Sequence, residues 1–183
     1  TLLRKGLENT DRRVREDRGV SPGFLFATLL WHEVLATWKA ARAGGGKAIP
    51  ALFEAMDAVL GEQAKKIAIP RRFEATIKEI WSLQPRFEQR AGGRPFRLLE
   101  HPGFRAGWDF LDLRCQSGEL EGELAGLADW WDRFANAGTD ERAAMLKPDE
   151  GPKPRSRGRG RGRKRRADGE VAQPDGAAPA GEA

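Results

Sequence analysis

Apolar residues recur at helical spacing along most of this chain. One stripe comprises Phe26, Leu29, Leu30, Val34 and Trp38. A second stripe comprises Phe73, Ile77, Ile80, Trp81 and Gln84, and a third comprises Leu120, Leu124, Leu127, Trp131 and Phe134. This spacing places apolar side chains on one face of an α-helix, so the pattern predicts an all-α fold.

Residues typical of helix starts lie at the beginnings of these stripes. Ser21-Pro22 places a capping residue before a proline at the first helical position, and Pro50, Pro70 and Pro102 each precede a further helical pattern. Glycines at 44–46 and 92–93 mark loops. We predict about seven helices, near 2–17, 22–43, 50–67, 71–90, 102–117, 119–136 and 140–146.

The helical pattern stops near Pro148. From there to Ala183 the chain holds 9 basic and 6 acidic residues and is rich in glycine, alanine and proline, a composition that cannot bury a core. The sequence therefore predicts two parts, a helical body at 1–147 and a disordered basic tail at 148–183.

Composition excludes several classes of protein. The 183 residues include one cysteine, Cys115, so no internal disulfide can form, and no Cys/His cluster offers a zinc site. No apolar run approaches the roughly 20 residues that a membrane span requires, so we expect no membrane contact and a cytoplasmic location. The chain begins at Thr1 rather than Met, and we interpret it as a fragment of a longer protein.

The tail is the part of the chain that points most directly to a partner. Eight of the twelve residues at 155–166 are cationic: Arg155, Arg157, Arg159, Arg161, Arg163, Lys164, Arg165 and Arg166. Such a segment neutralises phosphates, so we predict that these residues bind RNA. A solubilising tail, or one that binds acidic proteins, is the alternative interpretation.

Arg71 and Arg72 are candidate RNA-binding residues of the body. They lie at a predicted helix start, where cations oppose the helix dipole but free backbone amides help to bind phosphate. Pairing with Glu74, or with acids elsewhere in the fold, would explain them equally well.

Arg94, Arg97 and Arg105 are further candidates, because they flank two phenylalanines, Phe96 and Phe104. Arginine neutralises phosphate, and aromatic faces can stack on bases. We expect both phenylalanines to belong to the core, since folded domains bury most of their aromatic residues. The arginines are then the ligand candidates.

No catalytic or metal-binding set emerges from the sequence. His101 has no matching nucleophile or second histidine nearby in the sequence, and His32 lies within an apolar helical segment. We interpret both as structural or surface residues. The pairs Asp109/Asp112 and Asp129/Asp132 come without a phosphate-binding glycine loop, so we assign them to a solvated face or to local ion pairs.

Several segments resemble the C-terminal half of bacterial poly(A) polymerase I. They are Ile69-Pro70-Arg71-Arg72-Phe73, Glu79-Ile80-Trp81-Ser82-Leu83-Gln84 and Arg97-Leu98-Leu99-Glu100-His101-Pro102. The resemblance implies an RNA-binding region of an enzyme that adds AMP from ATP to RNA 3′ ends, in mRNA processing and decay.

In that family the active site belongs to an N-terminal nucleotidyltransferase head with a Gly-Ser element and paired aspartates. This sequence lacks that arrangement, so the resemblance implies no catalytic residue and no cofactor on this chain, with ATP and Mg²⁺ used by the missing head. Two alternatives remain, a non-enzymatic RNA-binding or ribosome-associated adaptor and part of a transfer RNA nucleotidyltransferase.

Overall fold

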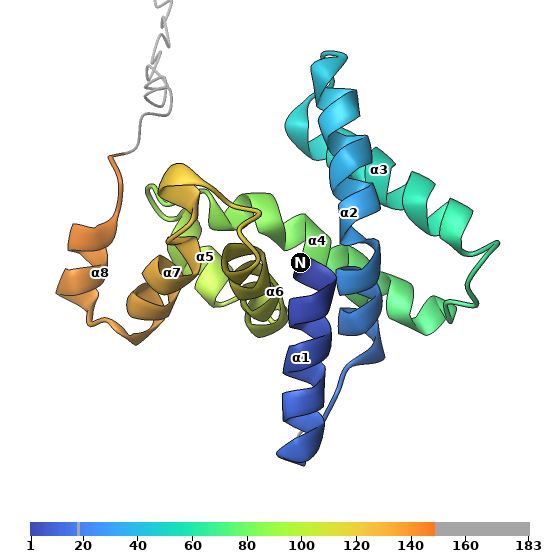
Figure 1. Cartoon of the computed structure of the whole chain (residues 1–183). Helices are drawn as coiled ribbons and strands as arrows, with labels where there is room; N and C mark the ends of the chain where they lie inside the picture. The colour runs from blue at the N-terminus through green and yellow to red at the C-terminus, as the bar shows by residue number, and fades with distance from the viewer. Residues whose placement is uncertain (18, 149–183) are drawn as a thin grey trace, which may run out of the picture. The chain divides into compact units, whose positions relative to one another are not determined.

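The computed structural model describes residues 1–17 and 19–148, and helices dominate this part of the chain (Figure 1). Its eight α-helices are α1 (Leu2–Arg15), α2 (Pro22–Ala43), α3 (Ala48–Gln63), α4 (Glu74–Phe87), α5 (Arg94–Leu99), α6 (Phe104–Gln116), α7 (Leu127–Asn136) and α8 (Thr139–Met145). Two 3₁₀ turns are present as well, η1 (Arg71–Phe73) and η2 (Gly122–Leu124). Over the same residues the only strand-type pairing is an isolated bridge between Ala91 and Lys147, so the all-α prediction is confirmed.

The start of α2 follows the sequence signal. The Ser21 Oγ accepts a hydrogen bond from the backbone amide of Phe24 at 3.4 Å, and Pro22 is the first helical residue. Ser21 therefore satisfies one of the amide groups that lack a partner in the first turn.

Two segments differ from the prediction. The short helix α5 was not expected, although Pro95 near its start is a usual helix-opening residue. The predicted helix at 119–136 begins only at Leu127, after the turn η2. Gly122 has a φ of +59°, a left-handed conformation that interrupts an α-helix.

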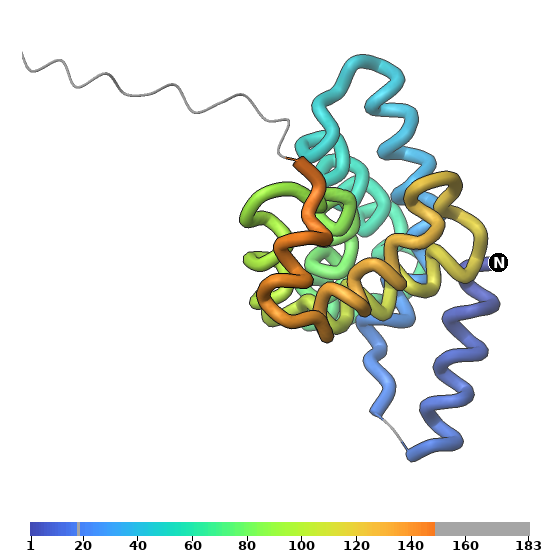
Figure 2. Tube along the Cα trace, turned by 90° about the vertical axis from the view of Figure 1, so that its left-hand side faces the viewer, coloured from blue at the N-terminus to red at the C-terminus, as the bar shows by residue number. Residues whose placement is uncertain are grey.

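The core consists of two apolar clusters. The first joins α2, α3 and α4 and includes Trp31, Leu52, Met56, Ile77 and Trp81, all at most 1% exposed. Figures 1 and 2 both show α3 beside α2. This cluster fixes the position of η1, since the Phe73 ring packs against it.

The second cluster joins α4, α5, α6 and α7 around Phe87, Trp131 and Phe134. The Phe87 and Trp131 rings meet edge to face, with centroids 5.3 Å apart. Gly107 lets α6 approach α4 closely, because a Cβ at this position would lie 2.9 Å from Leu83. The helices α4 and α6 contribute to both clusters and so connect the two halves of the body.

Residues 149–183, where the sequence predicts most of the disordered basic tail, lie outside the described residues. Within the described ones, no helix has both the length and the apolar character needed to cross a membrane.

Candidate nucleic-acid interface

Arg71 and Arg72 form the exposed turn η1 immediately before α4. The Arg72 guanidinium lies over the Phe73 ring, 4.8 Å from its centroid, and that ring in turn contacts Phe26 at 6.2 Å. The turn therefore rests on the first core cluster, and both charged groups face solvent. Neither arginine forms an ion pair with any residue in the described ranges, Glu74 included.

Two lysines extend this positive charge and were not among the predicted residues. Lys65 and Lys66 are exposed in the segment that joins α3 to η1. Lys65 pairs with Glu62 at 2.8 Å, and this contact lowers the pKa of the Glu62 carboxyl. A signal existed in the sequence, since four cations and no acid occur at 64–73.

Arg94 and Arg97 are exposed on α5, which follows α4 in the chain. Pro95 and Leu98 are buried and fix this short helix on the second core cluster. The helix α4 separates these arginines from η1, and its 14 residues correspond to about 21 Å at 1.5 Å per residue. The structure thus places the two pairs of arginines in separate regions of the body.

Arg105 lies on α6 and is partly committed to contacts within the fold. It pairs with Asp109 at 3.0 Å, and its guanidinium lies 5.0 Å from the centroid of the Trp108 ring. Its side chain is nevertheless 76% exposed, so the charged group stays accessible. Arg105 lines a cavity together with residues of α1, and no residue of α5 contributes to that cavity.

The aromatic residues between these arginines belong to the core, as the sequence predicts. Phe96 contacts Phe134 at 5.3 Å, and Phe104 contacts both Phe87 and Trp131 at 5.7 Å. Both rings are already in contact with core aromatic residues, so the arginines remain the candidates for ligand contact.

The two histidines and the cysteine have structural environments. The His101 Nδ1 accepts the Gly103 amide at 3.0 Å at the start of α6, and His32 is exposed on α2. Burial raises the pKa of the Cys115 thiol, which disfavours the thiolate. Residues 1–17 and 19–148 contain no cluster of three or more potential metal ligands.

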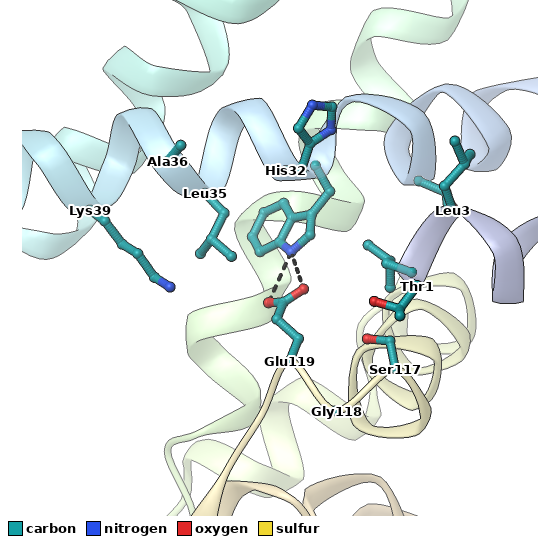
Figure 3. Close-up of a pocket in the computed structure, with 12 residues that line it drawn as sticks. Thr1, Leu3, His32, Leu35, Ala36, Lys39, Ser117, Gly118 and Glu119 are labelled. Carbon is teal, nitrogen blue, oxygen red and sulfur yellow. Dashed lines mark hydrogen bonds between the residues drawn. The ribbon is translucent and has the colours of Figure 1, made fainter.

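A buried polar network joins four segments of the body and was not predicted. The Arg114 guanidinium donates to Glu119 at 2.8 Å and to the Gln84 side-chain oxygen at 3.1 Å. The Trp31 indole N–H also donates to Glu119, at 2.9 Å (Figure 3). Gln84 completes the network by donating to the Gly107 carbonyl at 3.1 Å.

A cavity of about 530 Å³ opens beside Glu119, between the start of α1, the middle of α2 and the loop after α6 (Figure 3). Its wall includes Leu35, Lys39 and Ser117, and none of the predicted arginines contributes to it. The carboxylate at its base is already satisfied by Arg114 and Trp31. This cavity therefore adjoins a stabilising network and is separate from the candidate interface.

The chain matches the model of a known protein family, described as the polymerase A arginine-rich C-terminus, over residues 44–167. It is 41% identical over 155 residues to a protein of Salmonella typhimurium named poly(A) polymerase I, and equally to one of Escherichia coli O157:H7. Each match covers 84% of this chain and 33% of the relative. A third relative of the same name, from Haemophilus influenzae, is 34% identical over 157 residues, covering 84% of this chain and 34% of its own length. The chain thus spans about a third of the length of these curated relatives.

Proposed function

Because this chain belongs to the polymerase A arginine-rich C-terminus family, we propose that it is the RNA-binding C-terminal region of a poly(A) polymerase. The parent enzyme would add AMP from ATP to RNA 3′ ends in the cytoplasm, as a step in mRNA processing and decay. ATP and Mg²⁺ belong to a nucleotidyltransferase head outside this sequence, and this chain contributes to RNA contact.

The observation that carries the proposal is the family match itself, since it includes the arginine-rich segment 155–166. A run of closely spaced cations binds the phosphates of a single strand with little dependence on base sequence. This property suits an enzyme that must hold many different RNA ends.

The body supports the same function through its exposed cations. Arg71 and Arg72 project from a turn anchored on the core, and no carboxylate of the described residues neutralises them. Arg94 and Arg97 form a second exposed pair on α5, and Arg105 a third position on α6. We propose that the tail supplies general electrostatic affinity and that these fixed arginines orient the strand.

Fluorescence anisotropy with a labelled single-stranded oligoadenylate tests the proposal. The 183-residue chain should bind it, and the logarithm of the association constant should fall with the logarithm of salt concentration by about 0.7 for each phosphate neutralised. Polyglutamate is the matched competitor. If the tail binds acidic proteins rather than RNA, polyglutamate should displace the RNA from the chain. Absence of RNA binding at low salt, or equal affinity for polyglutamate, would contradict the proposal.

A further inference from the structure

A cavity of about 310 Å³ lies where α1, α2, α4 and α6 meet. Its wall includes the apolar residues Phe24, Leu25, Ile80, Pro102 and Ala106. The Phe24 ring is held in place by an edge-to-face contact with Phe110, with centroids 6.0 Å apart. The volume is near the lower limit for ligand pockets, which favours a single flat ring system over a large cofactor.

Two arginines, Arg13 and Arg105, line this cavity. Arg105 uses part of its hydrogen-bonding capacity on Asp109 and is largely exposed. Arg13 donates from two nitrogens to the Gly19 carbonyl, at 3.1 and 3.0 Å, which holds its side chain against the loop after α1. Each guanidinium has five N–H donors, so both retain donors for an anion.

An adjoining cavity of about 360 Å³ shares Asn9, Arg13, Arg105 and Asp109 with the first. Its wall adds two cations, Lys5 and Arg12, and three acids, Glu8, Glu16 and Asp112. Cations and acids are balanced over this second cavity, so it does not favour a continuous row of phosphates. The residues that the two cavities share include two cations, Arg13 and Arg105, against one acid, Asp109. An anion therefore fits best at this boundary, where positive charge exceeds negative charge.

We propose that the apolar cavity receives one unpaired base of single-stranded RNA and that the adjacent phosphate contacts Arg105 and Arg13. This inference rests on the proposed function, because it names the part of the RNA that this site takes. A base offers a flat apolar face to Phe24 and Pro102, and the backbone that follows it carries the charge that the guanidinium groups attract. Only an unpaired base can enter, since pairing and stacking hide its faces in a duplex.

Two trinucleotides of single-stranded RNA separate base insertion from phosphate binding. One is triadenylate, and the other has the same backbone with an abasic central residue. The 183-residue chain should bind triadenylate more tightly by roughly 5- to 100-fold, the range expected for stacking of one base. Equal affinity for the two trinucleotides would overturn the inference.

A variant that fills the cavity localises the effect. Ala106→Leu adds bulk to the wall without changing charge, and Ala75→Leu is its control on the exposed side of α4. The first variant should lose the preference for triadenylate, and the second should keep it.

A third variant, Arg105→Gln, tests the phosphate contact. It should lower the affinity for both trinucleotides to a similar extent, and it keeps the test valid if Ala106→Leu lowers the melting temperature. A preference retained in Ala106→Leu, or an Arg105→Gln variant that binds both trinucleotides as the unchanged chain does, would overturn the site.

Failure of this inference can be distinguished from failure of the proposed function. A chain that binds long oligoadenylate but shows no base preference on the trinucleotides retains its RNA-binding function and lacks this pocket. A chain that binds no RNA of any length contradicts both.

Discussion

The Arg114 guanidinium and the Glu119 carboxylate form an ion pair with an N–O distance of 2.8 Å in the interior of the body. Their side chains are 5% and 18% exposed, and the guanidinium also lies 4.9 Å from the centroid of the Trp31 ring. Burying two charges is costly unless each is paired and hydrogen-bonded. This pair satisfies that condition through Gln84 and Trp31, so α2, α4 and α6 are fixed relative to one another by polar as well as apolar contacts.

Removing one member of this pair should destabilise the body strongly. Arg114→Met leaves a buried carboxylate without its cation, and Glu119→Gln leaves a buried guanidinium without its counter-charge. We expect each to cost about 3–5 kcal/mol. The double variant should cost less than the sum of the two by about 1–3 kcal/mol, because it leaves no unpaired charge. Urea denaturation followed by circular dichroism measures all three, and strictly additive losses would contradict the coupling.

Unlike the Arg114–Glu119 pair, the Asp112 carboxylate should destabilise the folded body at neutral pH. Burial, and secondarily the charges of Asp109 and Asp129, raise the pKa of its carboxyl above the ordinary value of 3.8. The folded state then binds this proton more tightly than the unfolded state, so stability falls as the pH rises from that ordinary value through the folded-state pKa. Asp112→Asn should therefore raise the melting temperature at pH 7, by about 1–2 °C.

The gain from Asp112→Asn should disappear near pH 3, where the carboxyl is protonated in both states. Thermal melts of the two proteins at both pH values provide the test. Asp132→Asn is the matched control, because Asp132 is exposed on α7. An unchanged or lower melting temperature for Asp112→Asn at pH 7 would show that burial of this carboxylate costs nothing.

The sequence predicted the helices well wherever apolar spacing and capping residues agreed. Ser21-Pro22 predicted the start of α2 correctly, because a capping interaction involves only residues that are close together in the sequence. The segment at 119–126 was predicted wrongly, since its leucines keep helical spacing while Gly122 adopts a positive φ. Spacing alone does not show which backbone conformation a glycine takes.

The arrangement of the candidate site was harder to predict because it depends on contacts between distant segments. Arg94, Arg97 and Arg105 are close in sequence, yet only Arg105 of the three lines the cavity that includes Arg13. Gln84 and Arg114 are 30 residues apart in the chain and meet only after α4 and α6 have packed. No local pattern indicates such pairs, so the buried network and the cavity became visible only in the structure.

Removing residues 148–183 should weaken RNA binding and flatten its salt dependence. Neutralisation of about six phosphates by the cations at 155–166 would give a log–log slope of roughly −4 on a single strand. The truncated chain should keep most of its helix signal, because the helices of the described part end at Met145. Anisotropy at several salt concentrations, with circular dichroism on the same samples, checks both expectations. An unchanged salt slope after truncation would mean that the body, and not the tail, supplies the electrostatic affinity for RNA.

The chain alone should show no adenylyltransferase activity. Its sequence lacks the Gly-Ser element and strand-borne aspartates implied for the catalytic head, and it spans about a third of its curated relatives. Incubation with ATP, Mg²⁺ and an RNA primer is the direct assay, with a full-length relative as positive control. Primer extension that depends on the purified chain would contradict the assignment of catalysis to another region.

We propose that the folded body contacts RNA through fixed arginines, and one measurement tests this contact most directly. In a chain that lacks residues 148–183, Arg71 and Arg72 are both changed to Gln, and RNA affinity and melting temperature are measured on the same sample. Lys47→Gln with Arg133→Gln is the control, because it removes equal charge from exposed positions on α7 and just before α3. We predict weaker RNA binding, a salt slope shallower by about 0.7 for each lost contact, an unchanged melting temperature, and a smaller effect in the control. A lower melting temperature with unchanged RNA affinity would contradict this account, because it would show that Arg71 and Arg72 stabilise the fold instead of binding RNA.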